Sequence, residues 1–90
     1  MTPQRILETI AVYRKMFERR LIPQEPQPLD AQPRSHHESR AHCHDMLEAI
    51  ERFVREGKLE KAFRWLGFVQ GVLWASGCRT IAEMRSDNIG

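Results

Sequence analysis

The sequence contains no apolar run long enough to cross a lipid bilayer. Its most apolar stretch, residues 62–75, is interrupted by Arg64 and Gln70, and it falls short of the roughly 20 residues that a membrane-spanning helix needs. The first residues, MTPQRILETI, lack the apolar core of an export signal. We therefore expect no membrane contact and a location in the cytoplasm of the producing cell.

Cysteine is scarce, and charge of one sign does not dominate. Cys43 and Cys78 are expected to be reduced thiols in the core of a protein that is not exported. With 14 basic and 12 acidic residues the formal net charge is +2, which is too small to indicate nucleic-acid binding by itself. A chain of 90 residues predicts a single domain, residues 1–90.

Metal-ligand spacing is also missing, although one segment is rich in possible ligands. These are His36, His37, His42, Cys43 and His44. Those that share a helix face are seven residues apart, about 10 Å along the axis, whereas a zinc ion lies only about 2.0–2.3 Å from each ligand. We therefore predict no metal and no cofactor, with a site completed by Cys78 or by a second subunit as the alternative.

The pattern does not indicate a catalytic site either. Cys43 has a histidine on each side, but adjacent side chains on a helix point in different directions. A reactive cysteine also needs a polar, electropositive pocket, and Cys43 falls on an apolar stripe. The nearby acidic residues fit a solvated helix face: Glu48, Glu51, Glu56 and Glu60. We expect a protein that is not an enzyme.

Helical periodicity is the strongest positive signal, and it predicts an all-α fold. Apolar residues recur every three or four positions in the segments expected to be helical: 3–20, 35–56, 58–76 and 81–86. Thr2–Pro3 and two capping boxes, Ser35–Glu38 and Thr80–Glu83, indicate helix starts. Gly57 and Gly77 indicate helix ends. The connection around Gly57 is so short that the second and third helices must form an antiparallel hairpin.

Proline marks the segment between the first two helices. Pro23, Pro26, Pro28 and Pro33 exclude a helix or a paired strand there. We expect an extended linker with a reach of about 40 Å; a proline-rich docking peptide is the alternative. The domain should thus comprise an N-terminal helix (1–21), the linker (22–34), and the hairpin with a short final helix (35–90). We expect residues 86–90 to be frayed.

The segment 59–77 organises the rest of the chain. One apolar stripe predicts a core face: Leu59, Ala62, Phe63, Leu66, Val69 and Leu73. A second apolar group, Trp65, Phe68 and Val72, lies about 120° further round the helix and needs cover of its own. We expect Tyr13 and Phe17 of the first helix to cover it, either within the chain or across a homodimer interface.

These five residues and Trp74 are the candidate partner-binding residues. Trp74 is expected to pack on the short helix 81–86, with an exposed binding role as the alternative. Ile81 and Met84 of that helix are expected to fold back on the hairpin. Gly67 and Gly71 are four residues apart, a spacing that favours close approach by the backbone of a neighbouring helix.

A longer motif lies in the same region. The segment KAFRWLGFVQGVLW (61–74), followed by TIAEMRSDN (80–88), resembles small uncharacterised proteins of tailed bacteriophages. The resemblance covers residues 36–88 and includes histidines at the start of the preceding helix. It implies a phage or prophage origin, a shared fold and a bacterial host cell as the location, but no activity.

The leading interpretation is a small phage or prophage accessory protein that binds and modulates a host bacterial protein through apolar helix surface. It depends on the excess apolar surface of residues 59–77, on the lack of a catalytic signature and on the resemblance. The alternative is a nucleic-acid-binding regulator. Its candidate phosphate contacts are Arg14, Lys15, Arg19, Arg20 and Arg79. The acidic residues that would repel nucleic acid are Glu51, Glu56, Glu60 and Glu83.

Overall fold

The computed structural model describes residues 1–89 and contains four α-helices. They are α1 (Pro3–Arg19), α2 (His36–Arg55), α3 (Leu59–Ala75) and α4 (Ile81–Asp87). Residues 1–89 contain no β-strand, so the predicted all-α fold is confirmed. Each helix bound agrees with the expected one to within one residue. In the part of the chain that the structure describes, no helix is long and apolar enough to cross a membrane.

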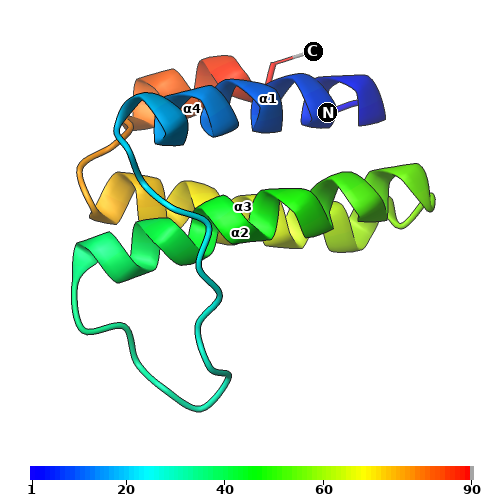
Figure 1. Cartoon of the computed structure of the whole chain (residues 1–90). Helices are drawn as coiled ribbons and strands as arrows, with labels where there is room; N and C mark the ends of the chain where they lie inside the picture. Colours follow the sequence, from blue (N-terminus) through cyan, green and yellow to red (C-terminus); the bar gives the residue numbers. More distant parts are fainter. Residues whose placement is uncertain (90) are drawn as a thin grey trace.

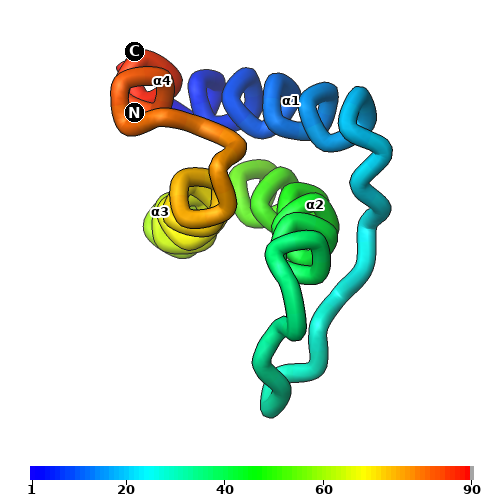
Figure 2. The backbone as a smooth tube through the Cα atoms, turned by 90° about the vertical axis from the view of Figure 1, so that its left-hand side faces the viewer, coloured from blue at the N-terminus to red at the C-terminus, as the bar shows by residue number. Residues whose placement is uncertain are grey.

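The helices are arranged in two layers. α2 and α3 lie side by side as an antiparallel hairpin, and α1 and α4 lie over them in the second layer (Figures 1 and 2). α2 packs most extensively against α3, and α1 packs more on α2 than on α3. In the view along the hairpin, α1 crosses it and α4 sits above α3 (Figure 2). The hairpin predicted from the short connection is therefore confirmed.

The first three helices end in the same way. A residue with positive φ follows each of them: Gly57 at +76°, Gly77 at +78° and Leu21 at +57°. The amide of the next residue then bonds back into the last turn; Cys78 N donates to Leu73 O at 2.7 Å, for example. The two glycines were predicted as helix ends. Leu21 was not, because an L-residue in this conformation costs about 1–2 kcal/mol.

The predicted capping boxes differ in the structure. At α4 the box is complete: Thr80 and Glu83 each accept a hydrogen bond from the backbone of the other. At α2 only half of it forms, because Glu38 N donates to the Ser35 hydroxyl while the Glu38 carboxylate accepts from Arg34 N and Arg34 Nε. The start of α2 is therefore capped by Ser35 as predicted, while the Glu38 carboxylate binds Arg34 in place of the Ser35 amide.

The core contains one apolar face from each of the first three helices. Its largest fully buried side chains are Tyr13, Phe17, Ile6, Ile10, Leu47, Ile50, Leu73, Val69 and Cys43. Tyr13 and Phe17 are 0% exposed, so they belong to the core of their own chain and not to a free surface. Within the chain, α1 packs on α2 and on the buried sector of α3, so Tyr13 and Phe17 do not cover Trp65, Phe68 and Val72 here as one of the two expected arrangements required.

Three further expectations about packing are wrong. Phe63 is 38% exposed and Ile81 is 53% exposed, so neither belongs to the core. α2 and α1 together cover only the sector of α3 that contains its buried residues Ala62, Leu66, Val69 and Leu73, and Phe63 lies beyond it. A Cβ added to Gly67 or Gly71 would meet no atom within 4 Å, so no helix of the same chain approaches these glycines closely.

Candidate functional site

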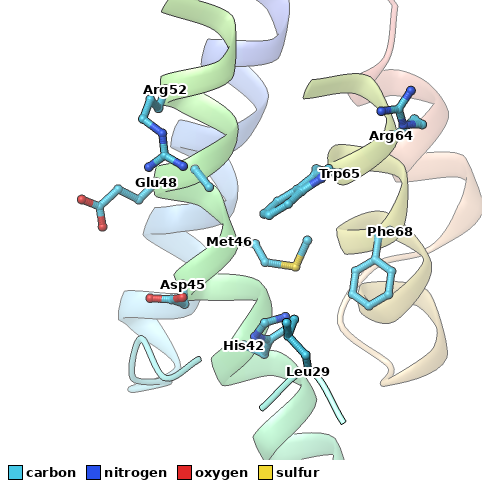
Figure 3. Close-up of a pocket in the computed structure, with 10 residues that line it drawn as sticks. Leu29, His42, Asp45, Met46, Glu48, Arg52, Arg64, Trp65 and Phe68 are labelled. Carbon is cyan, nitrogen blue, oxygen red and sulfur yellow. The ribbon is translucent and has the colours of Figure 1, made fainter. Parts of the chain in front are cut away.

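A groove lies between α2 and α3. It has a volume of about 670 Å³ and opens on the side of the hairpin away from α1 and α4, which lie behind it in Figure 3. Its lining residues are Leu29, His42, Asp45, Met46, Glu48, Ala49, Arg52, Arg64, Trp65 and Phe68. Two of the predicted partner-binding residues, Trp65 and Phe68, therefore lie in one groove.

The floor of the groove is apolar, and a core aromatic ring packs against it from inside the molecule. The Trp65 ring meets the Phe53 ring edge-on, with centroids 4.9 Å apart and an interplanar angle of 83°, a favourable aromatic geometry. Met46 contributes a buried side chain from α2, and Phe68 is 55% exposed. Figure 3 shows Trp65 and Met46 pointing toward one another across the groove. The apolar floor is thus already formed in the chain alone.

Charged side chains border this floor unevenly. Arg52 of α2 and Arg64 of α3 lie at one end, where α2 finishes and α3 begins (Figure 3). Asp45 and Glu48 lie along the α2 side. The one ion pair of Arg64 within residues 1–89, to Glu60 at 3.0 Å, is largely exposed and therefore weak. The groove is cationic at one end and anionic along one wall.

The linker closes the other end of the groove. A second hollow of about 510 Å³ lies under residues 27–33 and shares Leu29, His42 and Phe68 with the groove. It is also lined by Val72, which is partly buried. The two hollows therefore form one continuous surface, in which Val72 joins Trp65 and Phe68 as predicted from the helical spacing.

Two histidines of α2 hold the linker in this position. His44 Nδ1 lies 2.7 Å from Ile22 O, and its ring stacks on Phe17 with centroids 5.1 Å apart. His42 Nδ1 accepts a hydrogen bond from Gln27 N at 3.1 Å, and Glu25 N donates to the backbone of α2 as well. The linker is free of helix and strand, as predicted. Its residues 22–27 are bonded to α2, and the rest loops away from the hairpin before α2 begins (Figures 1 and 2).

The remaining candidate ligands do not form a metal site. His36 and His37 are exposed, while His42 and His44 bond to different linker residues. Within residues 1–89 no three His, Cys, Asp or Glu side chains lie close enough to hold a metal ion.

Both cysteines are free and buried. Burial, reinforced by the neighbouring Cys78 thiol, raises the pKa of Cys43 to about 12, so its thiol is almost entirely protonated at neutral pH. Cys78 Sγ accepts a hydrogen bond from Arg20 at 3.3 Å. Since the thiolate is the nucleophilic form, Cys43 is a packing residue, as expected from its place on the apolar stripe.

A polar cluster at the C-terminal end was missed by the sequence reasoning. The Arg79 guanidinium donates to both carboxylate oxygens of Asp87, at 2.6 and 2.9 Å, and Arg5 Nε donates to Asp87 O at 2.7 Å. Gln70 joins the cluster through the Tyr13 hydroxyl and Asn88. These bonds fasten α4 to α1 and α3, so the expectation of a frayed tail is wrong for Asp87 and Asn88; the end of that tail, Gly90, lies outside the described residues.

The other predicted residues are dispersed. Trp74 lies beside the start of α4, in a hollow shared with Cys78 and Ile81, yet it is 56% exposed. Of the proposed phosphate contacts, Arg14 pairs with Glu51 at 3.6 Å and Arg79 is bound to Asp87 and Glu83. Two of the five proposed phosphate contacts are therefore paired with carboxylates, whereas Lys15, Arg19 and Arg20 are exposed.

Comparisons with protein-family models, curated proteins and solved structures found no match to this chain.

Proposed function

We propose that the chain is a small protein-binding adaptor whose α2–α3 groove receives an apolar helical segment of another protein. In line with the resemblance to phage proteins, the partner is a host bacterial protein that the adaptor modulates. The observation that carries the proposal is the preformed floor of Met46, Trp65 and Phe68, which no helix of the described chain covers. Exposed apolar patches with a polar rim are typical of interaction sites.

The shape of the groove favours a helix as its occupant. A groove between two antiparallel helices accepts a third helix along its length, in the way amphipathic helices bind to apolar grooves. Its α2 wall runs from His42 to Arg52, a rise of about 15 Å, which corresponds to roughly three turns of helix. Apolar anchors three or four residues apart on the partner would meet Trp65 and Phe68 in turn.

The charges around the groove restrict the partner further. An acidic side chain at one end of the partner helix would meet Arg52 and Arg64, since opposite potentials face each other in specific interfaces. A basic side chain further along would meet Asp45 on the α2 wall. We therefore propose an amphipathic helix with an acidic end and a basic flank as the bound segment.

The test uses variants that keep the fold. Phe68→Glu places a charge on the floor at a half-exposed position, and Val12→Glu is the matched control, because Val12 is 49% exposed on α1. A bacterial protein captured from lysate should bind the purified wild type in titration calorimetry, with at least about tenfold weaker binding to Phe68→Glu and unchanged binding to Val12→Glu. Equal binding to both variants, or capture of nucleic acid that salt removes, would overturn the proposal.

A further inference from the structure

The two histidines that hold the linker have opposite roles in their hydrogen bonds. The backbone N–H of Gln27 can only donate, so His42 Nδ1, 3.1 Å away, must accept and carries no proton. The backbone carbonyl of Ile22 can only accept, so His44 Nδ1, 2.7 Å away, must carry a proton. The bond of His42 therefore requires a neutral imidazole, whereas the bond of His44 forms with a neutral or a protonated ring.

The first part of the linker is fixed by contacts that do not involve His42. Ile22 is buried, and the bond from its carbonyl to His44 survives protonation of the ring. Glu25 N donates to the Ala41 carbonyl of α2 at 3.1 Å, and neither of these groups titrates. The linker is therefore attached to α2 up to Glu25 at any pH at which the helices are folded.

The linker tip, residues 28–33, is held much more weakly. All six residues are exposed, and within residues 1–89 the hydrogen bonds nearest to the tip lie just outside it. On one side Gln27 N donates to His42, and on the other side Arg34 binds the Glu38 carboxylate. The bond to His42 is therefore the only one of these two ties that needs a neutral imidazole.

This tip lies over one end of the groove. The hollow of about 510 Å³ beneath it is lined by Leu29 from the linker and by Phe68 and Val72 from α3. Leu29 also lines the groove itself, yet its side chain is fully exposed. The tip thus overhangs apolar surface of α3 without being packed against it.

We propose that the linker tip is a pH-sensitive strap, which protonation of His42 releases so that this end of the groove opens. A protonated ring would present an N–H to the N–H of Gln27, so the docked strap binds fewer protons than the released one. By linkage, docking is strongest above the pH range in which histidine titrates and weakens as pH falls through that range. For its effect on partner binding, this regulation rests on the function proposed above.

The surroundings of His42 permit protonation. The ring is partly exposed, and the residues that α3 places in the hollow are apolar. The nearest charged residue of the groove, Asp45, lies one turn further along α2. It favours the imidazolium whether the strap is docked or released. The remaining charges are Glu48 on α2, Glu25 and Asp30 on the linker, and Arg52 and Arg64 at the far end of the groove.

The second tie of the tip does not titrate in the same range. Arg34 N and Arg34 Nε donate to the Glu38 carboxylate at 3.2 and 3.0 Å, and these bonds hold the pKa of Glu38 below its ordinary value. Glu38 therefore stays ionised while histidine takes up its proton. The released tip moves between two points that remain attached, Glu25 and Arg34.

Hydrogen exchange of the free protein at about pH 7.5 and about pH 5.5 tests the release, because histidine titrates between these values. After correction for the intrinsic effect of pH, protection of the Gln27 amide should fall about two- to tenfold at the lower pH. Protection of the Glu25 amide should stay the same. An equal protection of Gln27 at both pH values would overturn the proposal.

Two variants assign the effect to His42. His42→Asn places a carboxamide oxygen where Nδ1 lies and does not titrate, so Gln27 protection should be independent of pH. His36→Ala removes an exposed histidine and should keep the fall seen in the wild type. The same fall in His42→Asn would overturn the role of His42.

Nile red, an uncharged apolar dye, tests the opening of the groove. Its affinity for the wild type should rise about two- to tenfold from pH 7.5 to pH 5.5, whereas it should stay constant in His42→Asn. The rise should also be absent in Phe68→Glu, which places a charge in the hollow. Exchange at Gln27 that depends on pH without any change in dye affinity would overturn control of the groove by the strap. Neither measurement uses a partner protein, so failure of the proposed function leaves both results interpretable.

Discussion

The hydroxyl of Tyr13 donates a hydrogen bond to a carboxylate oxygen of Asp87, 2.6 Å away and 74 residues along the chain. Both groups are buried, and the bond joins α1 to the end of α4. The same carboxylate is bound by Arg79, whose guanidinium lies 5.7 Å from the centre of the Tyr13 ring. This cluster, more than apolar contact, fastens the short α4 to the rest of the molecule.

We expect Asp87→Asn to lower the free energy of unfolding by about 2 kcal/mol, because an amide presents N–H groups where the carboxylate accepts charge-assisted bonds. Urea unfolding followed by tryptophan fluorescence measures the change. Asp30→Asn, on the exposed turn of the linker, is the matched control and should change nothing. An Asp87→Asn variant as stable as the wild type would show that the cluster contributes no net stability.

The same carboxylate should make stability depend on pH. Burial by itself raises the pKa of Asp87, but the hydrogen bonds from Arg79 and Tyr13 outweigh it and hold the pKa below its ordinary value. A carboxyl with a lowered folded pKa stabilises the fold above the unfolded pKa, about 3.9, and this contribution is lost as pH falls through the lower folded value. Asp87→Asn should therefore lose less stability than the wild type between about pH 5 and pH 2. Parallel curves for the two proteins would contradict this.

Local signals in the sequence predicted much of this fold. Gly57, Gly77 and the Thr80–Glu83 box each act over a few residues, so the helix bounds were predicted to within one residue. No local pattern in the sequence predicts the hydrogen bond between Tyr13 and Asp87, because it depends on where α4 packs after the turn at Gly77. Features that depend on neighbouring residues, such as helix ends, were predicted. Contacts between residues far apart along the chain were missed, whatever the residue types.

The candidate site follows the same rule. Helical spacing brought Trp65, Phe68 and Val72 together on one side of α3, and they do line one continuous hollow. Helical spacing wrongly placed Phe63 in the core, because the exposure of this side chain depends on how far α1 extends over α3. It was also impossible to predict that Leu29, which is fully exposed at the linker tip, lines the groove. A proline-rich segment has no periodicity that would show which way its side chains face.

The hydrogen bond from Gln27 N to His42 Nδ1, which holds the linker against α2, gives a prediction for His42→Ala. Removing the imidazole leaves Gln27 N–H without the acceptor it has in the structure, a loss of about 0.5–1.5 kcal/mol. Hydrogen exchange at the Gln27 amide should speed up by about two- to tenfold, while helix amides of α3 stay unchanged. His36→Ala, at an exposed position, should leave Gln27 exchange as in the wild type. Unchanged exchange at Gln27 in His42→Ala would show that the linker is held by its other contacts.

The protonated thiol of Cys43 leads to a prediction about reactivity. With its pKa raised to about 12 and its side chain 0% exposed, Cys43 should resist iodoacetamide at neutral pH for as long as the protein stays folded. In urea the same residue should be alkylated at the rate of an ordinary thiol. Peptide mass spectrometry after timed labelling measures both rates. Rapid labelling of Cys43 in the folded protein would mean that the core opens often around α2.

Leu21 gives the last prediction, because its backbone is strained and its side chain does little. The residue has φ +57° and is 87% exposed, so the side chain loses almost no packing when it is removed. Leu21→Gly relieves the clash of Cβ in this conformation, worth about 1–2 kcal/mol, against a somewhat larger backbone entropy in the unfolded chain. We expect a net gain of about 0.5–1 kcal/mol in the free energy of unfolding, measured in urea. Leu29→Gly removes an equally exposed leucine at a position without positive φ, so it should give no gain. If both variants lose stability alike, the bond from Ile22 N to Phe17 O holds this turn without cost to the leucine.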